Sequence, residues 1–284
     1  MKELRHDLTT RRYWRHFVLN TLAGVGALSV VVNLVAVFYP QSVIDNRKIL
    51  IVASILLSVG YGGYRSWPRS ISETYSTPNV TIRLEKGDLL DQECHLVIGF
   101  CDTFDTSVPE IIARTSLQGQ FLERTYNNDA ARLDGDIERA LVGIKPEGTI
   151  TKMGKTVQYG VGAVVTLGAL EHKHFLLAYT RMDGTNQARA TADGVWKALG
   201  ELWRVVGREA NGGTVAIPVI GGGQARLAQI LPAQDSIRFI ALSFMLASRH
   251  EKVCDELRIV VRPTEYERLD RLEIQAFLTS LRPS

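Results

Sequence analysis

The strongest constraint on this chain is a long stretch without any charged side chain, residues 17–39. A helix needs about 20 predominantly apolar residues to cross a bilayer. A second uncharged stretch, 49–64, follows after the short link 40–48, so we predict two transmembrane helices paired as a hairpin. A buried hairpin in a soluble protein is the alternative. A signal peptide is disfavoured, because the first stretch is too long for one and a second stretch follows it.

The charged flanks predict how this hairpin is oriented. Residues 1–16 are basic, and Arg65 and Arg69 follow the second stretch. Because basic flanks remain in the cytoplasm, we expect a multi-pass protein whose N-terminus and C-terminal part are both cytoplasmic. The segment 65–79 is rich in Ser, Thr and Pro and is predicted to be a linker, so that residues 80–284 form the cytoplasmic domain.

Small residues recur at a spacing of four in the second apolar stretch, at Ser54, Ser58 and Gly62. This spacing places them on one helix face, where a second helix can approach closely. Small residues are also common in membrane helices in general, so the pattern is compatible with close packing and with no special role.

Within the domain, residues 214–226 read as a buried strand that runs into three consecutive glycines. Valine and isoleucine favour the strand, and glycines leave main-chain N–H groups open to a ligand. A strand, a glycine loop and a following helix can cradle a phosphate. The loop lacks the Gly-Lys-Ser/Thr of a P-loop and the GxGxxG spacing of dinucleotide-binding folds. A phosphate site and a plain turn both remain open on these residues alone.

The rest of the domain alternates predicted strands and helices, which indicates an α/β fold with a mixed sheet flanked by helices. Strands are predicted at 80–84, 96–100, 157–167, 175–180, 214–220 and 257–261. A helix broken by Gly119 is predicted at 109–126. Further helices are predicted at 133–142, 186–208, 233–248 and 264–281.

Composition excludes several classes of function. The 33 basic residues nearly balance the 30 acidic ones, so charge gives no case for binding nucleic acid. The three cysteines include no CxxC pair, and we expect neither a disulfide framework nor a metal site. Asp102 and Asp105 share one loop but have no His or third carboxylate at ligand spacing, and Cys101 has no identifiable helper base.

Three motifs in order make the region from residue 80 resemble a macro domain, the three-layer α/β/α module that binds ADP-ribose. Gly87, Asp88 and Leu89 resemble the family's Gly-Asp-Ile/Leu element, and the loop 101–107 stands where its first ligand loop stands. Residues 216–223 resemble its pyrophosphate loop. The resemblance implies that Asp88 takes the adenine amino group and that the glycine loop takes the pyrophosphate.

The resemblance implies an ADP-ribose derivative as the ligand. Asp102 and Asp105 are expected to bond ribose hydroxyls, the loop backbone or a basic group on a modified ligand. The expected ligand-binding residues are Asp88, Leu89, Cys101, Asp102, Thr103, Phe104, Asp105, Thr106, Ile220, Gly221, Gly222, Gly223, Gln224, Ala225 and Arg226.

Further motifs resemble one branch, the membrane-anchored macro effectors of Thoeris-type bacterial antiphage defence. They are Phe104-Asp105-Thr106, the segments 116–121 and 177–180, and the two apolar stretches. This resemblance implies that a partner TIR-domain enzyme releases an ADP-ribose-derived signal, which the macro domain senses. The effector is then expected to form a homo-oligomer in the bacterial inner membrane and to damage the lipid bilayer.

One departure from the family pattern bears on catalysis. Macro domains that process ADP-ribose carry a catalytic asparagine in the first ligand loop, and the loop CDTFDTS has none. We therefore expect a sensor, with no catalytic residue, no metal and no cofactor besides the ligand. The alternatives are a membrane-tethered ADP-ribosyl hydrolase and a structural adaptor that binds a protein.

Overall fold

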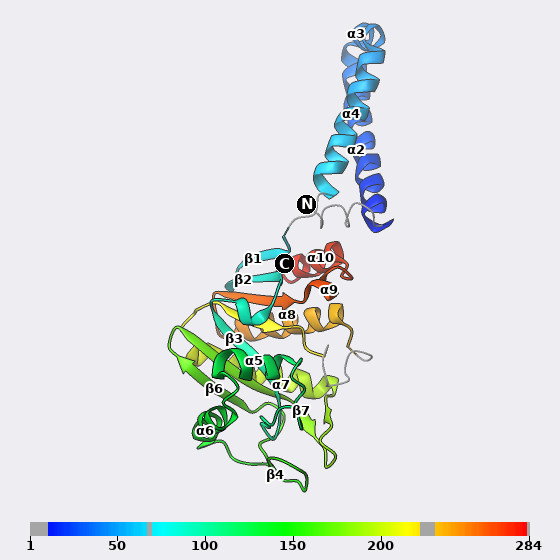
Figure 1. The fold of residues 1–284 in the computed structure, drawn as a ribbon. Helices are drawn as coiled ribbons and strands as arrows, with labels where there is room; N and C mark the ends of the chain where they lie inside the picture. Colours follow the sequence, from blue (N-terminus) through cyan, green and yellow to red (C-terminus); the bar gives the residue numbers. More distant parts are fainter. Residues whose placement is uncertain (1–10, 67–69, 222–230, 283–284) are drawn as a thin grey trace. The chain divides into compact units, whose positions relative to one another are not determined.

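The computed structural model describes residues 11–66, 70–221 and 231–282. The chain divides into two compact units, residues 1–69 and 70–284, which are treated separately below (Figure 1).

The first unit is a pair of packed helices. The helices α2 (Arg11–Phe38) and α4 (Arg47–Ser66) lie side by side, and the short helix α3 (Pro40–Asp45) occupies the predicted link (Figure 1). Among the described residues, one helix is long and apolar enough to cross a membrane: Tyr13–Phe38 within α2, with a mean hydropathy of 2.2. The predicted second span, 49–64, lies within α4, which does not meet the same criterion.

The composition of α4 explains this difference. Charged residues stand at both of its ends, Arg47 and Lys48 at the start and Arg65 near the end. Its second half also contains three glycines and two tyrosines, which lower its hydropathy further: Gly60, Tyr61, Gly62, Gly63 and Tyr64. By length and composition, α2 is therefore supported as a membrane span among the described residues, and the second predicted span within α4 is not.

The second unit is built on a mixed sheet, as predicted, and its strand order is β1-β2-β10-β9-β3-β7-β6. The inner strands β2, β10, β9, β3 and β7 run parallel, while β1 and β6 are antiparallel edges. The main strands are β1 (Ser72–Ser76), β2 (Asn79–Lys86), β3 (His95–Cys101), β6 (Val164–Ala169), β7 (His172–Met182), β9 (Val215–Pro218) and β10 (Glu256–Val261). Short strands β4 (Gly148–Thr149) and β5 (Val157–Gln158) form a separate pair, and β8 (Ala188–Arg189) pairs with β7.

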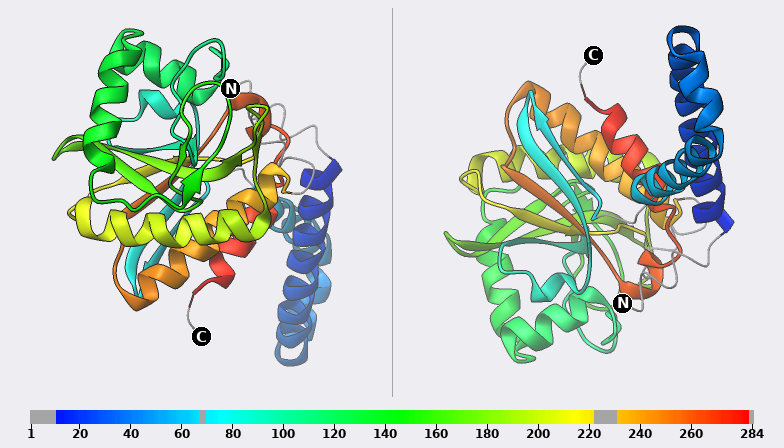
Figure 2. Two further views of the ribbon diagram at one scale, coloured as in Figure 1. Left: turned by 90° about the horizontal axis from the view of Figure 1, so that it is seen from below. Right: turned by 90° about the horizontal axis from the view of Figure 1, so that it is seen from above.

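Helices cover both faces of this sheet, which gives the three layers expected of the fold (Figures 1 and 2). One face packs on α7 (Ala192–Glu209), α8 (Ala233–His250) and α10 (Arg271–Ser280). The other face packs on α5 (Leu117–Tyr126) and α6 (Ala130–Leu141). Two short helices, η1 (Leu89–Asp91) and α9 (Pro263–Tyr266), follow β2 and β10.

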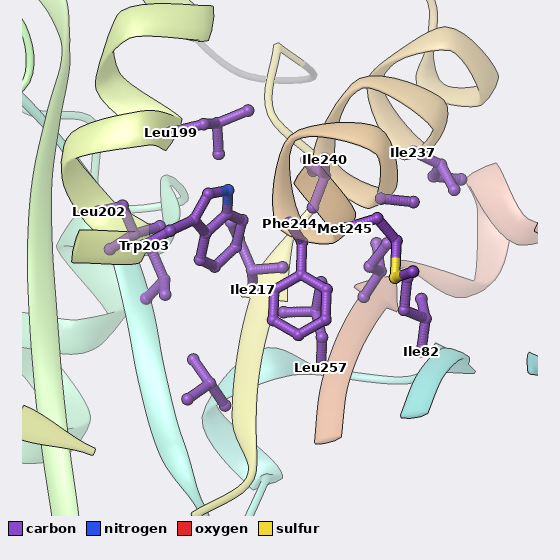
Figure 3. Packing of buried hydrophobic residues seen from close by; sticks show 14 of the residues in the cluster. Ile82, Leu199, Leu202, Trp203, Ile217, Ile237, Ile240, Phe244, Met245 and Leu257 are labelled. Carbon is purple, nitrogen blue, oxygen red and sulfur yellow. The ribbon is translucent and has the colours of Figure 1, made fainter. Parts of the chain in front are cut away.

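Strand alternation divides the core between the two faces. In β3, Val97 belongs to the α7–α8 side, whereas Leu96 and Ile98 belong to the α5–α6 side. Figure 3 shows the first core, in which Trp203 of α7 and Phe244 of α8 pack over the sheet. The buried indole Nε1–H of Trp203 donates to Ser243 Oγ at 2.9 Å, so its polar atom is satisfied inside the core.

The structure corrects several predicted elements. The predicted strand 157–167 is divided into β5 and β6, and the predicted helix 186–208 begins only at Ala192, after β8. The linker 65–79 contains β1, because Ile71 and Tyr75 are buried apolar residues within a run of Ser and Thr. The predicted helix 109–126 begins only at Leu117, after turns, and contains Gly119 without a break. The predicted helix 264–281 is divided into α9 and α10, since Asp270 starts a new helix by capping Glu273 N.

Candidate functional site

A cleft of about 1170 Å³ lies at the carboxyl ends of the parallel strands. Ligands in open α/β sheets bind at this edge, outside the ends of the strands. Five strand ends supply its walls: β2 through Gly87–Leu89, β3 through Gly99–Cys101, β7 through Leu177–Met182, β9 through Ile217–Gly221, and β10 with α9 through Val260–Glu265.

The predicted adenine-binding residue, Asp88, lines this cleft with its neighbour Leu89. Asp88 caps η1, because Leu90 N–H donates to its Oδ1 at 3.0 Å. Its other oxygen accepts from Arg124 of α5 at 3.0 Å, and its side chain is 40% exposed. A carboxylate can accept further hydrogen bonds beside these two, so Asp88 retains acceptor capacity toward the cleft.

The end of β9 also reaches the cleft. Ile220 and Gly221 line it, and Gly221 has a φ of 106°, a conformation that favours glycine. Ile220 N–H donates to the buried Ser236 Oγ of α8 at 3.1 Å, which fixes the strand end to that helix. The remaining predicted residues of the glycine loop, Gly222, Gly223, Gln224, Ala225 and Arg226, lie outside the described residues.

The loop after β3 is arranged differently from the expectation. Cys101 contributes to the cleft lining, and burial raises the pKa of its thiol. The next five residues of the predicted site are buried and do not contribute to the lining among the described residues. They are Asp102, Thr103, Phe104, Asp105 and Thr106.

The polar groups of this loop are bonded to the protein itself. Asp102 accepts from Met182 N at 2.8 Å and from Gln158 Nε2 at 3.0 Å, and burial raises the pKa of its carboxyl group. Thr106 Oγ1 donates to Asp134 Oδ1 at 2.5 Å. Asp102 was expected to bond ribose hydroxyls, the loop backbone or a basic group on the ligand. Its partners here, Met182 and Gln158, lie outside the loop.

Asp105 is the centre of a buried ion pair. Its Oδ2 lies 2.7 Å from Lys152 Nζ, and the two side chains are 1% and 0% exposed. Lys155 N donates to Oδ1 at 2.9 Å, and Thr103 Oγ1 donates to Oδ2. Gln118 of α5 donates to the backbone oxygen of Asp105. These bonds fix the loop to the β4–β5 segment and to α5, so the wall that carries Cys101 is preformed.

Several cleft residues were not in the predicted site. The ring of Tyr179 lies against Gly99, where a Cβ atom would collide with it, and burial raises its pKa to about 12. The others come mainly from the turns before α5, the segment after β7 and the segment after β10. They include Ile111, Ile112, Gln118, Gln120, Ala188, Arg262, Thr264 and Glu265. Arg262 and Thr264 follow the predicted strand 257–261, so the rule that ligands bind at the carboxyl ends of strands indicates them.

Comparison with known proteins gives a consistent result. The family model described as "Thoeris protein ThsA, Macro domain" matches residues 82–262, more than half of the chain. A curated relative, Thoeris protein ThsA of Bacillus amyloliquefaciens (strain Y2), is 28% identical over 151 residues. The alignment covers 51% of this chain and 50% of that relative, so the chain spans about half the length of the relative it matches.

Two solved structures of an Oceanobacillus iheyensis macrodomain resemble the chain in fold. The form with ADP has a TM-score of 0.48 and 10% identity, covering 75% of this chain and 97% of that chain. A variant of the same macrodomain has a TM-score of 0.48 and 13% identity, covering 75% and 95%. On the strength of the family match across residues 82–262, this chain belongs to the family of Thoeris ThsA macro domains.

Proposed function

We propose that the protein is a Thoeris defence effector whose macro domain senses an ADP-ribose-derived nucleotide. The observation that carries this proposal is the cleft, which brings Asp88, Leu89, Ile220 and Gly221 to one edge of the sheet. Its volume of about 1170 Å³ exceeds that of a typical small-molecule pocket and suits an extended nucleotide. The family match across this same region supports the assignment.

In this proposal the ligand is bound and is not consumed. The carboxylates of the loop after β3, Asp102 and Asp105, are engaged by protein groups and are buried away from the cleft lining. A general base must reach the proton that it abstracts, either directly or through one water. Because their oxygens already accept from main-chain, amide and ammonium donors, these carboxylates suit a structural role better than a catalytic one.

The N-terminal helices complete the proposed mechanism. Tyr13–Phe38 is apolar enough to cross a membrane, and we propose that α2 and α4 together form a multi-pass hairpin in the bacterial inner membrane. A TIR-domain enzyme supplies the signal, and the liganded effector forms homo-oligomers that disrupt the bilayer. A ligand can drive this change only if it binds the assembled state more tightly than the free state.

The test is calorimetry of the full chain in detergent with ADP-ribose, ADP and GDP. We expect binding of the two adenine nucleotides. Asp88→Ala should weaken it about 10- to 100-fold, because a hydrogen bond to a carboxylate is lost. The matched control is Glu138→Ala, which removes an exposed carboxylate on α6 and should leave binding unchanged. If the folded protein binds none of the three nucleotides, the sensor proposal fails.

The hydrolase alternative is tested on the same protein. Incubation with an ADP-ribosylated peptide, followed by mass spectrometry, should recover the peptide with its modification intact. Release of ADP-ribose from the peptide would establish an enzyme in place of a sensor.

A further inference from the structure

We propose that α10 couples the nucleotide cleft to β1, the strand that follows directly on the segment leading from the N-terminal helices. The inference rests on the proposed sensor function and names the element by which the site regulates the rest of the chain. It is carried by two separate sets of side-chain bonds, one at each end of α10. In Figures 1 and 2, α10 lies beside α8 and β1, in agreement with the contacts between these elements.

The first set of bonds connects the wall of the cleft to the start of α10. Ile220, a cleft residue, is held by the buried Ser236 of α8. Two neighbours of Ser236 on α8 reach α10: Gln234 Nε2 donates to Glu273 Oε2 at 2.7 Å, and Arg238 pairs with the other oxygen of Glu273. The side chain of Gln234 also accepts from the backbone N–H of Asp270, the residue that caps α10, at 3.0 Å.

A covalent connection leads to the same point. The cleft is lined by Arg262, Pro263, Thr264 and Glu265, which begin α9, and the chain continues from α9 into Asp270 and α10. The start of α10 is therefore joined to two walls of the cleft, one through α8 and one through α9.

The second set of bonds connects the body and the end of α10 to β1. Glu73 of β1 is only 6% exposed, and its carboxylate accepts from Gln275 Nε2 at 2.9 Å and from Thr279 Oγ1 at 3.4 Å. Arg282 pairs with the other oxygen of Glu73. Tyr75 Oη–H donates to Leu278 O at 2.7 Å, and the ring of Tyr75 is buried.

The two sets of bonds on α10 differ in how exposed they are to solvent, and this difference allows a change at the cleft to reach β1. Glu273 is half exposed, with 53% of its side chain accessible, and its bonds can exchange with water at small cost. Glu73 is buried, so displacing α10 from it would leave a carboxylate without its partners, which is costly. A shift of the cleft wall can therefore alter the Glu273 end, while the Glu73 end holds β1 to α10. Coupling of this kind is a free energy that must be measured, because spatial continuity alone does not establish it.

The experiment is a double-variant cycle read by amide hydrogen exchange of the full chain in detergent. Ser236→Ala perturbs the cleft wall and Glu273→Ala removes the contact to α10, while Glu138→Ala on α6 is the control for the charge change. We expect Ser236→Ala to change the exchange of β1 amides about threefold or more, and to have a smaller effect on β1 when Glu273→Ala is also present, since the Glu273 bonds are then lost while the Gln234–Asp270 bond still joins α8 to α10. The amides of β6, the antiparallel strand at the opposite edge of the sheet, should exchange at the same rate in all variants.

Repeating the exchange measurement with ADP-ribose distinguishes a failure of this inference from a failure of the sensor proposal. ADP-ribose should slow β1 exchange in the unsubstituted chain and do so less in Glu273→Ala, where the connection through α9 and the Gln234–Asp270 bond remain. Calorimetry should give both proteins the same affinity within about twofold. If ADP-ribose binds neither protein, the sensor proposal fails and the double-variant cycle still decides the coupling. The coupling is overturned if the effects of Ser236→Ala and Glu273→Ala on β1 multiply independently.

Discussion

At the scale of single residues, Asp105 shows how a residue expected in the binding site can serve the fold. Its carboxylate and the ammonium of Lys152 are almost completely buried, 2.7 Å apart. Removing one partner of such a pair leaves an uncompensated buried charge, which costs about 3–5 kcal/mol. We expect Asp105→Asn to lower the free energy of unfolding by this amount in urea denaturation of the chain.

An exposed pair provides the control for this prediction. Asp91 pairs with Arg124, but 64% of its side chain is accessible to solvent. Asp91→Asn should therefore cost less than about 1 kcal/mol. Equal losses for the two substitutions would show that the Asp105–Lys152 pair contributes no more than a surface ion pair.

The imidazole of His174 predicts a dependence of stability on pH. Burial, with smaller contributions from His172 and His95, lowers its pKa from 6.5 to about 4. Between these two pH values the unfolded chain binds a proton that the folded chain does not, so stability falls as the pH drops through this window. The loss should reach about 2–3 kcal/mol by pH 4.

The variant His174→Phe tests the assignment of this pH dependence. Phenylalanine preserves an aromatic contact with Phe121, whose ring centroid lies 5.0 Å from that of His174. Urea denaturation between pH 7 and pH 4 should show a shallower decline for the variant. An unchanged slope would assign the decline to other groups.

At the scale of elements, the contact between α2 and α4 depends on glycine. A Cβ atom on Gly62 would collide with Thr21 Oγ1 and lie 3.2 Å from Phe17 O, whereas one on Gly63 would meet nothing within 4 Å. Gly62→Ile should therefore weaken the helix pair by about 1–3 kcal/mol, and Gly63→Ile should leave it intact. The measurement is the distance between spin labels on α2 and α4 in detergent micelles. Similar distances in both variants would contradict the prediction.

The helices and strands were predicted well where the hydrophobic periodicity is strong. They were predicted poorly where tertiary contacts determine where an element begins, ends or breaks. The strand at 96–100 and the helix at 233–248 lie within β3 and α8, because their apolar patterns match the strand and helix periods. Gly119 was expected to interrupt a helix. It is accommodated because the absence of a side chain lets α5 approach Ala113 O closely.

The site was predicted in the same uneven way. Asp88 was indicated by the resemblance to the family's Gly-Asp-Ile/Leu element, and Ile220 and Gly221 by the strand that runs into consecutive glycines. All three line the cleft. The orientation of side chains within the loop after β3 was not identifiable, because it depends on Lys152, whose partner lies 47 residues away in sequence. Ion pairs between distant residues leave no periodic signal in a single sequence.

At the scale of the whole molecule, the division at residue 69 predicts an independent domain. Residues 70–284 hold the entire sheet, both hydrophobic cores and every described residue that lines the cleft. A domain with its own core can fold alone. The fragment 70–284 should therefore be monomeric and unfold cooperatively, with a midpoint within about 4 °C of the domain transition in the full chain. It should also bind ADP-ribose, because α2 and α4 contribute no described residue to the cleft. Its affinity should be no tighter than that of the full chain, because only the full chain carries the helices proposed to assemble when the ligand binds. Calorimetry and thermal unfolding of the fragment test both statements, and a fragment without a cooperative transition would show that the helix pair is required for folding.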